Sequence, residues 1–390
     1  MRQTAILPGI FLVCLFATAG TASSQTPSNS AGATAVEQLP AGNNGVAAAN
    51  ENGAITLDVV VEDKSGAPVG GLEPGDFKLL DNKLPQGLVS VQAENGMRAS
   101  ADPPVEAIVV IDAINSTFLS VSNARQWVAN FLKENGGELA LPTSMVVLTD
   151  HSMARQKDPS RNGKALLEFL DANATGLREI KRAQGWEGAM EREQASLSMI
   201  DALAAQEQKS PGRKLVIWVS PGWHLISNYS WNGSQKDQEI LFDSIVSAST
   251  ELRAARMTVY SIDPAGVGRG QWAYQSYLKG VDSPRHADFG SLMLQVLAAQ
   301  TGGQVLEGNN DLAGLIDRCI ADAKAYYVLT FHPGPAAHPN EYHSLAVQVD
   351  KPGLKVRTRT GYYAQATMMR AQWQRNIPFQ SVEDSKGPQY

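Results

Sequence analysis

The chain has 390 residues, of which 43% are hydrophobic and 18% are charged, and its formal net charge is -6. Acidic and basic residues are interspersed, so the sequence offers no basic stripe to neutralise phosphates, and nucleic acid is excluded as an expected partner. The length allows two domains of about 150 residues each, with a sizeable core.

The first 24 residues have the layout of a secretory signal peptide. Arg2 precedes an apolar stretch from about Ala5 to Ala19, and small residues follow as far as Ala22. The apolar stretch is too short for a comfortable membrane span. We therefore expect residues 1–24 to be removed and the mature protein to be periplasmic or secreted, with no stable membrane span. Cys319 is then the remaining cysteine, and its helix-like surroundings favour a small buried side chain over a reactive thiol.

Two segments precede the central part of the chain. Residues 25–53 are rich in Ala, Gly, Asn, Ser and Thr and bury little apolar surface, which predicts a disordered linker. Residues 54–98 contain the alternating run ITLDVVVE and two shorter runs, DFKLLDN and GLVSVQA, each bounded by turn residues. Period-2 alternation predicts strands, so this is an N-terminal β segment without an evident core of its own.

Residues 104–325 alternate apolar runs with amphipathic stretches. We expect strands that end at Asp112, Leu148, Ser220 and Asp263. The expected helices cover 120–133, 164–172, 196–205, 240–255, 291–300 and 312–325. This alternation predicts an α/β domain of three layers with a mostly parallel central sheet.

Residues 326–364 return to short alternating runs, AYYVLTF, SLAVQV and LKVRTR, separated by Pro- and Gly-rich turns. Neither this group nor the N-terminal β segment is large enough to be stable alone. We predict that the two groups pack together as one small β subdomain beside the α/β domain. The polar tail, residues 365–390, shows little periodicity and is expected to be loose.

The run EAIVVIDAINST, from Glu106 to Thr117, organises the α/β domain. Its unbroken apolar part predicts a strand covered on both faces. Asp112 then stands at the carboxyl end of that strand, where open α/β sheets bind ligands. The alternative for Asp112 is a structural role, in which it caps the next helix or accepts hydrogen bonds from turn amides.

Several phrases in this order and spacing resemble a von Willebrand factor A domain, and more narrowly the exported bacterial, acidobacterial-type VWFA-related family. They are VVVEDKSGAPVGGLEPGDFKLLDN, IVVIDAINST, PGRKLVIWVSPGW, TVYSIDPAG, LAAQTGGQVLE, AYYVLTF and GLKVRTRTGYYA. The resemblance covers about Ile55 to Ala364 and implies a Rossmann-like A domain with three layers. It also implies a non-enzymatic, adhesion-type protein that binds a protein or envelope partner.

The A-domain family is known for a metal-ion-dependent adhesion site that binds Mg²⁺ or another divalent cation. By resemblance, Asp112 matches the first acid of its Asp-x-Ser-x-Ser loop and Ser116 the last hydroxyl, and Asn115 offers a carbonyl. Ile114 replaces the middle Ser, and Ser220 stands where an Asp usually lies. Hard cations need several oxygen ligands, so this motif predicts a degenerate, weak site, and no cofactor is assigned with certainty.

The partner-binding surface is therefore expected at this sheet edge, formed by Asp112, Asn115, Ser116, Ser220 and Trp223. Trp223 lies in the aromatic loop PGWHLISNYSWNG, and such loops often anchor protein interfaces. Packing of the Trp223 ring against its own domain is the competing interpretation.

Two further functions are weighed. Ser220 with His224 or His151 would make an envelope hydrolase, although the Gly-x-Ser-x-Gly elbow is absent. A scaffold whose ligand edge has decayed is the other alternative. His332, His338 and His343 fit no standard zinc spacing and are predicted to be solvated turn residues.

Overall fold

The computed structural model describes residues 53–98, 104–149, 153–173, 185–223, 234–264, 273–309 and 311–364. Its central layer is a seven-stranded sheet that is parallel except for two short strands at one side. The strand order is β11 (Val305–Leu306), β10 (Met257–Ile262), β9 (Lys214–Val219), β5 (Glu106–Asp112), β6 (Glu138–Leu148) and β7 (Met153–Arg155), and β8 (Ser160–Asn162) also pairs with β6. The prediction of a mixed α/β fold with a mostly parallel central sheet is confirmed.

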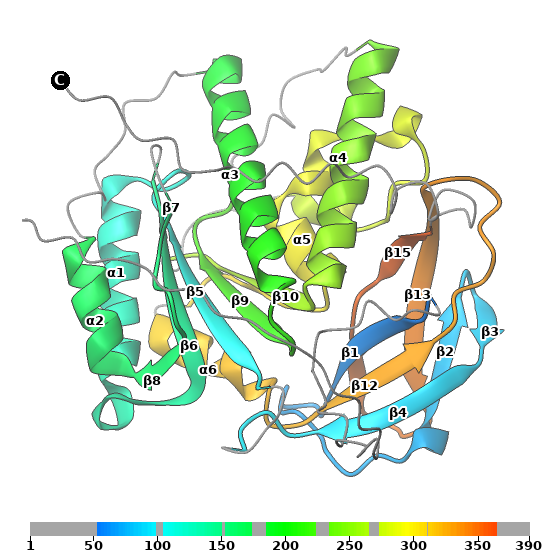
Figure 1. Ribbon diagram of the computed structural model, residues 1–390, viewed down its shortest axis with the longest axis horizontal. Helices are drawn as coiled ribbons and strands as arrows, with labels where there is room; N and C mark the ends of the chain where they lie inside the picture. Colours follow the sequence, from blue (N-terminus) through cyan, green and yellow to red (C-terminus); the bar gives the residue numbers. More distant parts are fainter. Residues whose placement is uncertain are drawn as a thin grey trace, which may run out of the picture. The chain divides into compact units, whose positions relative to one another are not determined.

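Helices cover both faces of this sheet (Figure 1). On one face lie α1 (Phe118–Lys133), α2 (Gly163–Ala172) and α6 (Leu312–Ala321), and on the other lie α3 (Gly185–Glu207), α4 (Gln235–Ala254) and α5 (Leu294–Gln300). Short 3-10 turns include η1 (Pro74–Asp76), η2 (Glu134–Gly137), η5 (Ala273–Tyr277), η6 (Pro284–His286) and η7 (Phe289–Leu292). We call this three-layer part the α/β module.

Two smaller sheets form a second part, which we call the β module. One sheet has the order β14 (Lys355–Arg357), β1 (Ile55–Glu62), β12 (Tyr326–Phe331) and β4 (Leu88–Glu94). The other has the order β15 (Gly361–Ala364), β13 (Glu341–Val349), β2 (Phe77–Asp81) and β3 (Leu84–Gln86). All these pairs are antiparallel, and each sheet contains strands from both ends of the described chain.

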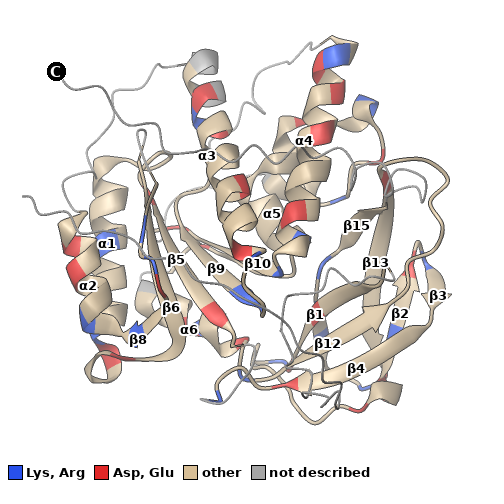
Figure 2. Cartoon of the chain, in the orientation of Figure 1, with Lys and Arg blue, Asp and Glu red and all other residues tan. Residues whose placement is uncertain are grey.

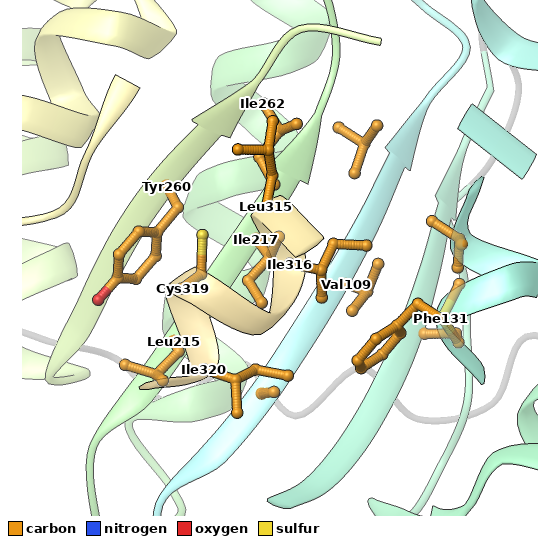
Figure 3. Packing of buried hydrophobic residues seen from close by; sticks show 14 of the residues in the cluster. Val109, Phe131, Leu215, Ile217, Tyr260, Ile262, Leu315, Ile316, Cys319 and Ile320 are labelled. Carbon is orange, nitrogen blue, oxygen red and sulfur yellow. The ribbon is translucent and has the colours of Figure 1, made fainter. Parts of the chain in front are cut away.

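The apolar pattern of the sequence explains the packing of both modules. β5 and β9 are buried on both faces, as their unbroken apolar runs require. Cys319 on α6 lies in the same core beside Tyr260 and Ile316, and it is fully buried (Figure 3). Strand β1 contributes to both modules, because Val59 packs in the core of the β module while Val60 packs in that of the α/β module.

A buried ionic cluster joins the two modules. The Arg357 guanidinium on β14 donates to Glu62 Oε1 on β1 at 2.6 Å and to both carboxylate oxygens of Asp322, just after α6, at 2.7 and 2.8 Å. It also donates to the carbonyl of Gly302 at 2.8 Å. The Tyr260 hydroxyl on β10 donates to Asp322 as well, at 2.6 Å. Burial raises the pKa of this Tyr260 hydroxyl well above its usual range, so it remains a donor.

The structure corrects the prediction for one histidine. His332 and His338 are exposed, but His343 lies inside β13 and is only 6% exposed. Its Nδ1 atom lies 2.9 Å from Asp81 Oδ1, and the Tyr362 hydroxyl donates to the other oxygen of Asp81 at 2.7 Å. Side chains of β13 alternate between the two faces of the sheet, and this alternation turns His343 toward the interior. The Pro-rich sequence before His343 had led to the prediction of a turn.

Several element boundaries also differ from the expectation; for example, α4 begins at Gln235 rather than at 240. Helix α3 begins at Gly185 rather than near 196, so the charged segment around Trp186 is part of the helix. Helix α6 ends at Ala321, before the predicted 325. In the part of the chain that the structure describes, none of the helices has the length and apolar character needed to cross a membrane.

We expect Arg357→Gln to lower the free energy of unfolding by about 3–5 kcal/mol, because Asp322 and Glu62 would become buried charges without a full partner. Urea denaturation measured by circular dichroism gives this value. Arg125→Gln is the matched control, since Arg125 pairs with Asp171, whose side chain is 78% exposed, and such pairs contribute about 0–1 kcal/mol. Equal losses in the two variants would contradict a structural role for the cluster.

Candidate functional site

The carboxyl ends of the parallel strands bring several predicted residues to one edge of the central sheet. Asp112 ends β5, Ser220 follows β9 and Asp263 follows β10. All three are buried, with exposed fractions of 1%, 0% and 8%. The predicted edge therefore exists, but most of its polar groups face the protein rather than solvent.

The Asp112 carboxylate is fully engaged by its own surroundings. Its Oδ1 atom accepts from the backbone amides of Ile114 at 2.8 Å and Asn115 at 3.1 Å. Its Oδ2 atom accepts from Asn115 Nδ2 at 2.9 Å and from the Trp218 indole at 3.0 Å. An ionised carboxylate has about four acceptor positions, so four donors saturate Asp112. This arrangement corresponds to the structural role weighed for Asp112 in the sequence, in which the carboxylate accepts hydrogen bonds from turn amides.

These residues do not fit a divalent cation. Both oxygens of Asp112 already accept protein hydrogen bonds, and Mg²⁺ requires hard oxygen ligands with free lone pairs. Ile114, where the A-domain motif has a serine, packs in the core beneath α3. Ser116 is half-buried next to this loop. Among the described residues, no group of three or more His, Cys, Asp or Glu side chains is placed to hold a metal ion.

The surroundings of Ser220 give its side chain a structural role. Its hydroxyl oxygen accepts from the backbone amide of Gly222 at 3.2 Å, and the side chain is fully buried. A nucleophile must reach the carbonyl that it attacks, so a fully buried hydroxyl is poorly suited to hydrolysis. His151 and His224, the two histidines considered for this chemistry, lie outside the described residues.

Trp223 does not offer its ring to a partner. It is 2% exposed and packs edge-on against Trp218, with ring centroids 5.6 Å apart. The expectation of an exposed anchor at Trp223 is therefore wrong, and the competing interpretation of packing against its own domain is correct. The driving force is the apolar area that a large ring removes from water. The later aromatic residues of this loop lie outside the described residues.

The exposed apolar surface at this edge comes instead from the first turn of α1. Thr117 caps the helix by accepting from the backbone amide of Ser120. Phe118 and Leu119 follow the cap and are 59% and 69% exposed. Because the buried positions of α1 begin at Ser120, these two side chains lie outside the core-facing stripe. We call Ser116, Thr117, Phe118 and Leu119 the α1 apex.

A second unusual group, Glu193, lies on α3 near the same edge. One turn further along the helix, the Ser196 hydroxyl accepts from Asn115 Nδ2 at 2.8 Å, which ties α3 to the Asp112 loop. Glu193 is 4% exposed, and both of its carboxylate oxygens are buried without a hydrogen-bond partner among the described residues. Burial, reinforced by the negative charge of Asp288, raises the pKa of Glu193 to about 8.

Glu193 lines a pocket of about 190 Å³ between α3, α4 and η7, which we call the α3–α4 pocket. A larger hollow of about 670 Å³ lies in the β module, between η1 and strands β2, β3 and β4. Among the described residues that line this hollow, Lys78 is the only charged one, so the larger hollow has little to offer a charged ligand. The α3–α4 pocket is the one that combines apolar walls with a buried acid.

Glu193 and the α1 apex are functional candidates that were not expected from the sequence, although the sequence contains a signal for each. The buried positions of α3 include Glu193, Ser196, Ile200, Leu203 and Glu207, which follow a spacing of three and four. Extending that helical stripe backward from Ile200 would have placed an acid in the core. For the α1 apex, the signal was two large apolar residues between a polar loop and the first core position.

Comparisons with known proteins do not assign the chain to a family. No family model matches, and no curated protein matches. Among solved structures, one similar chain is the pilus adhesin SpaC from Lactobacillus rhamnosus GG, with 8% sequence identity and a TM-score of 0.34. The alignment covers 76% of this chain and 49% of the adhesin, so the chain spans about half the length of that protein.

We expect Asp112→Asn to cost about 2 kcal/mol of stability, because an amide NH₂ would replace an acceptor and face the donors of Trp218 and Asn115. The loss should be the same with and without 5 mM Mg²⁺. This concentration is roughly 100 times a Kd of 50 μM, and an ion bound with that Kd would add about 2.7 kcal/mol to the stability of the folded chain. Thermal unfolding of both proteins measures it. A rise in Tm with Mg²⁺ in the wild type, absent in Asp112→Asn, would contradict our conclusion that the loop does not fit a cation.

Glu193 should make stability depend on pH. The folded chain keeps the Glu193 proton up to a pKa of about 8, whereas the unfolded chain loses it near 4.5, so folding takes up a proton between these values. The contribution is most favourable below pH 4.5, and about 3 kcal/mol should be lost between pH 5 and pH 8. Urea unfolding across this range should show a smaller loss for Glu193→Gln. Glu191→Gln, an exposed position on the same helix, should behave as the wild type.

Proposed function

We propose that this protein is an exported, non-enzymatic binding protein of the von Willebrand A type, which recognises a protein or envelope partner without a metal ion. The carboxyl-end edge of the central sheet is the binding region, as the A-domain resemblance implies. The single observation that carries the proposal is the α1 apex, where Phe118 and Leu119 are 59% and 69% exposed directly beside the Asp112 loop.

Physical reasons favour this position for a partner. Large apolar and aromatic side chains supply most of the energy at protein interfaces, particularly where surrounding polar groups exclude water. Ser116 and Thr117 provide such polar groups next to Phe118. The cap at Thr117 fixes the first turn of α1, so the two side chains project from a rigid element and lose less entropy on binding.

The expected partner contacts also differ from those of a metal-dependent A domain. In that mechanism a partner carboxylate completes the coordination of the cation, so chelators abolish binding. Here the saturated Asp112 loop supports a different role, in which the loop holds the first turn of α1 in place. We therefore expect binding to survive EDTA.

Hydrolysis through Ser220 is the less favoured alternative. The buried hydroxyl and its contact with Gly222 speak against it. The scaffold hypothesis predicts no specific capture by any surface of the protein, and the following experiment separates it from binding.

We expect Phe118→Ser combined with Leu119→Ser to reduce capture of the specific partner at least tenfold, because two apolar anchors of an interface together contribute about 2 kcal/mol or more. The immobilised mature chain is incubated with a cell-envelope extract of the producing organism, with and without EDTA. Proteins retained by the wild type and by the variant are then compared by quantitative mass spectrometry.

Leu84→Ser combined with Val89→Ser is the matched control. These residues are 70% and 58% exposed but lie in the β module, so they remove similar apolar surface elsewhere. The α1 apex would be refuted as the binding surface if both double variants lost specific capture equally. It would also be refuted if neither variant lost it.

A further inference from the structure

The α3–α4 pocket, with its buried acid Glu193, has no part in the proposed function. Its walls are Leu197 on α3, Ile240 and Leu241 on α4, and Phe289 on η7, and the helices lie side by side (Figure 1). At about 190 Å³ it exceeds an engineered cavity of about 150 Å³ that accommodates benzene. A small organic group therefore fits inside.

The ionisable side chains among the described residues that line this pocket are all acidic. Glu193 is buried, and its two oxygens have no partner there, whereas Asp237 is an exposed lining residue. Asp237 accepts from the Ser234 hydroxyl and from the Ser234 backbone amide, each at 2.8 Å, and these bonds lower the pKa of Asp237, so it is ionised. Asp288, before η7, adds a negative charge near Glu193. Figure 2 shows acidic residues along both helices.

A buried acid without a partner is costly in a folded protein. Desolvation of such a group is normally offset by hydrogen bonds or an opposite charge. The described residues supply neither to Glu193, and no Lys, Arg or His is among the described residues that line the pocket. A positively charged group that enters from outside would stabilise the ionised form of Glu193, which the described residues leave without a partner.

From this geometry we propose that the α3–α4 pocket binds a primary alkylammonium group, with a lysine side chain of a partner protein as its natural source. The four-carbon stem of lysine suits the walls formed by Leu197, Ile240 and Leu241, and its ammonium group would pair with Glu193. An arginine guanidinium fits less well, because two of its five donors would bond to the Glu193 carboxylate and the remaining three would face the apolar walls.

This inference goes beyond the proposed function, because it concerns a pocket that binds a positively charged group, whereas the α1 apex is an exposed apolar surface. The α1 apex follows the Asp112 loop in the chain, and α3, which carries Glu193, is hydrogen-bonded to that loop through Ser196. The two are nevertheless tested separately. Failure of the alkylammonium test leaves the capture experiment with Phe118 and Leu119 unaffected.

The test is an NMR titration of the full mature chain with Nα-acetyl-lysine methylamide, its norleucine counterpart and n-butylamine. The lysine compound and butylamine should bind and shift resonances of α3 and α4, while norleucine, which has the stem without the charge, should bind at least tenfold more weakly. Equal binding of the norleucine compound would overturn the proposal. Binding of butylamine alone would overturn lysine as the source.

Variants and pH give the second readout. Glu193→Gln should weaken binding of the lysine compound at least tenfold, whereas Glu191→Gln should leave it unchanged. With a pKa of about 8, Glu193 is mostly protonated at pH 6 and mostly ionised at pH 9, while the lysine ammonium stays charged throughout. Affinity should therefore be at least tenfold higher at pH 9 than at pH 6 in the wild type. Wild-type affinity in a folded Glu193→Gln variant would refute the pocket.

Discussion

The Arg357 guanidinium is the interaction on which the arrangement of the two modules depends. It comes from β14 in the β module and reaches Glu62 on β1 and Asp322 at the end of α6. Charges taken out of water are tolerated only when their partners have good geometry, so this cluster permits few relative positions of the modules. Val60 and Tyr326, which belong to β-module strands, pack in the α/β core and add apolar area to the same junction.

At the carboxyl-end edge of the central sheet, the two buried acids Asp112 and Glu193 differ in how their carboxylates are hydrogen-bonded. The Asp112 carboxylate accepts four hydrogen bonds from the protein, which makes its loop a rigid support. Glu193, one helix turn from the residue that anchors this loop to α3, has no hydrogen-bond partner among the described residues. Rigid support beside an unsatisfied acid is the arrangement that a recognition site requires, because the support limits the entropy lost on binding.

Much of the fold could be predicted from the sequence because its signals are local. Unbroken apolar runs such as EAIVVID and KLVIWV predicted buried parallel strands, and the spacing within α1 and α4 predicted their core-facing sides. The site was harder, because it depends on which donors meet which acceptors across long distances in sequence. No local pattern shows that the Trp218 indole reaches Asp112, or that Trp223 packs on Trp218 rather than facing solvent. His343 was misjudged for the same reason, since its partner Asp81 is far away in the chain.

The pairing of β1 also has a consequence for how the chain folds. Its residues bond with β12 and β14, which are among the last strands of the described chain. The first described strand can therefore pair only after nearly all of the described chain has been synthesised. Proteins are synthesised from the N-terminus, and contacts of such long range form slowly. During that interval the apolar run ITLDVVVE has neither of its neighbours, a state that favours association with other chains. The α/β module, whose strands pair within a continuous part of the sequence, does not share this delay. The β module is thus the part whose assembly a chaperone would have to protect.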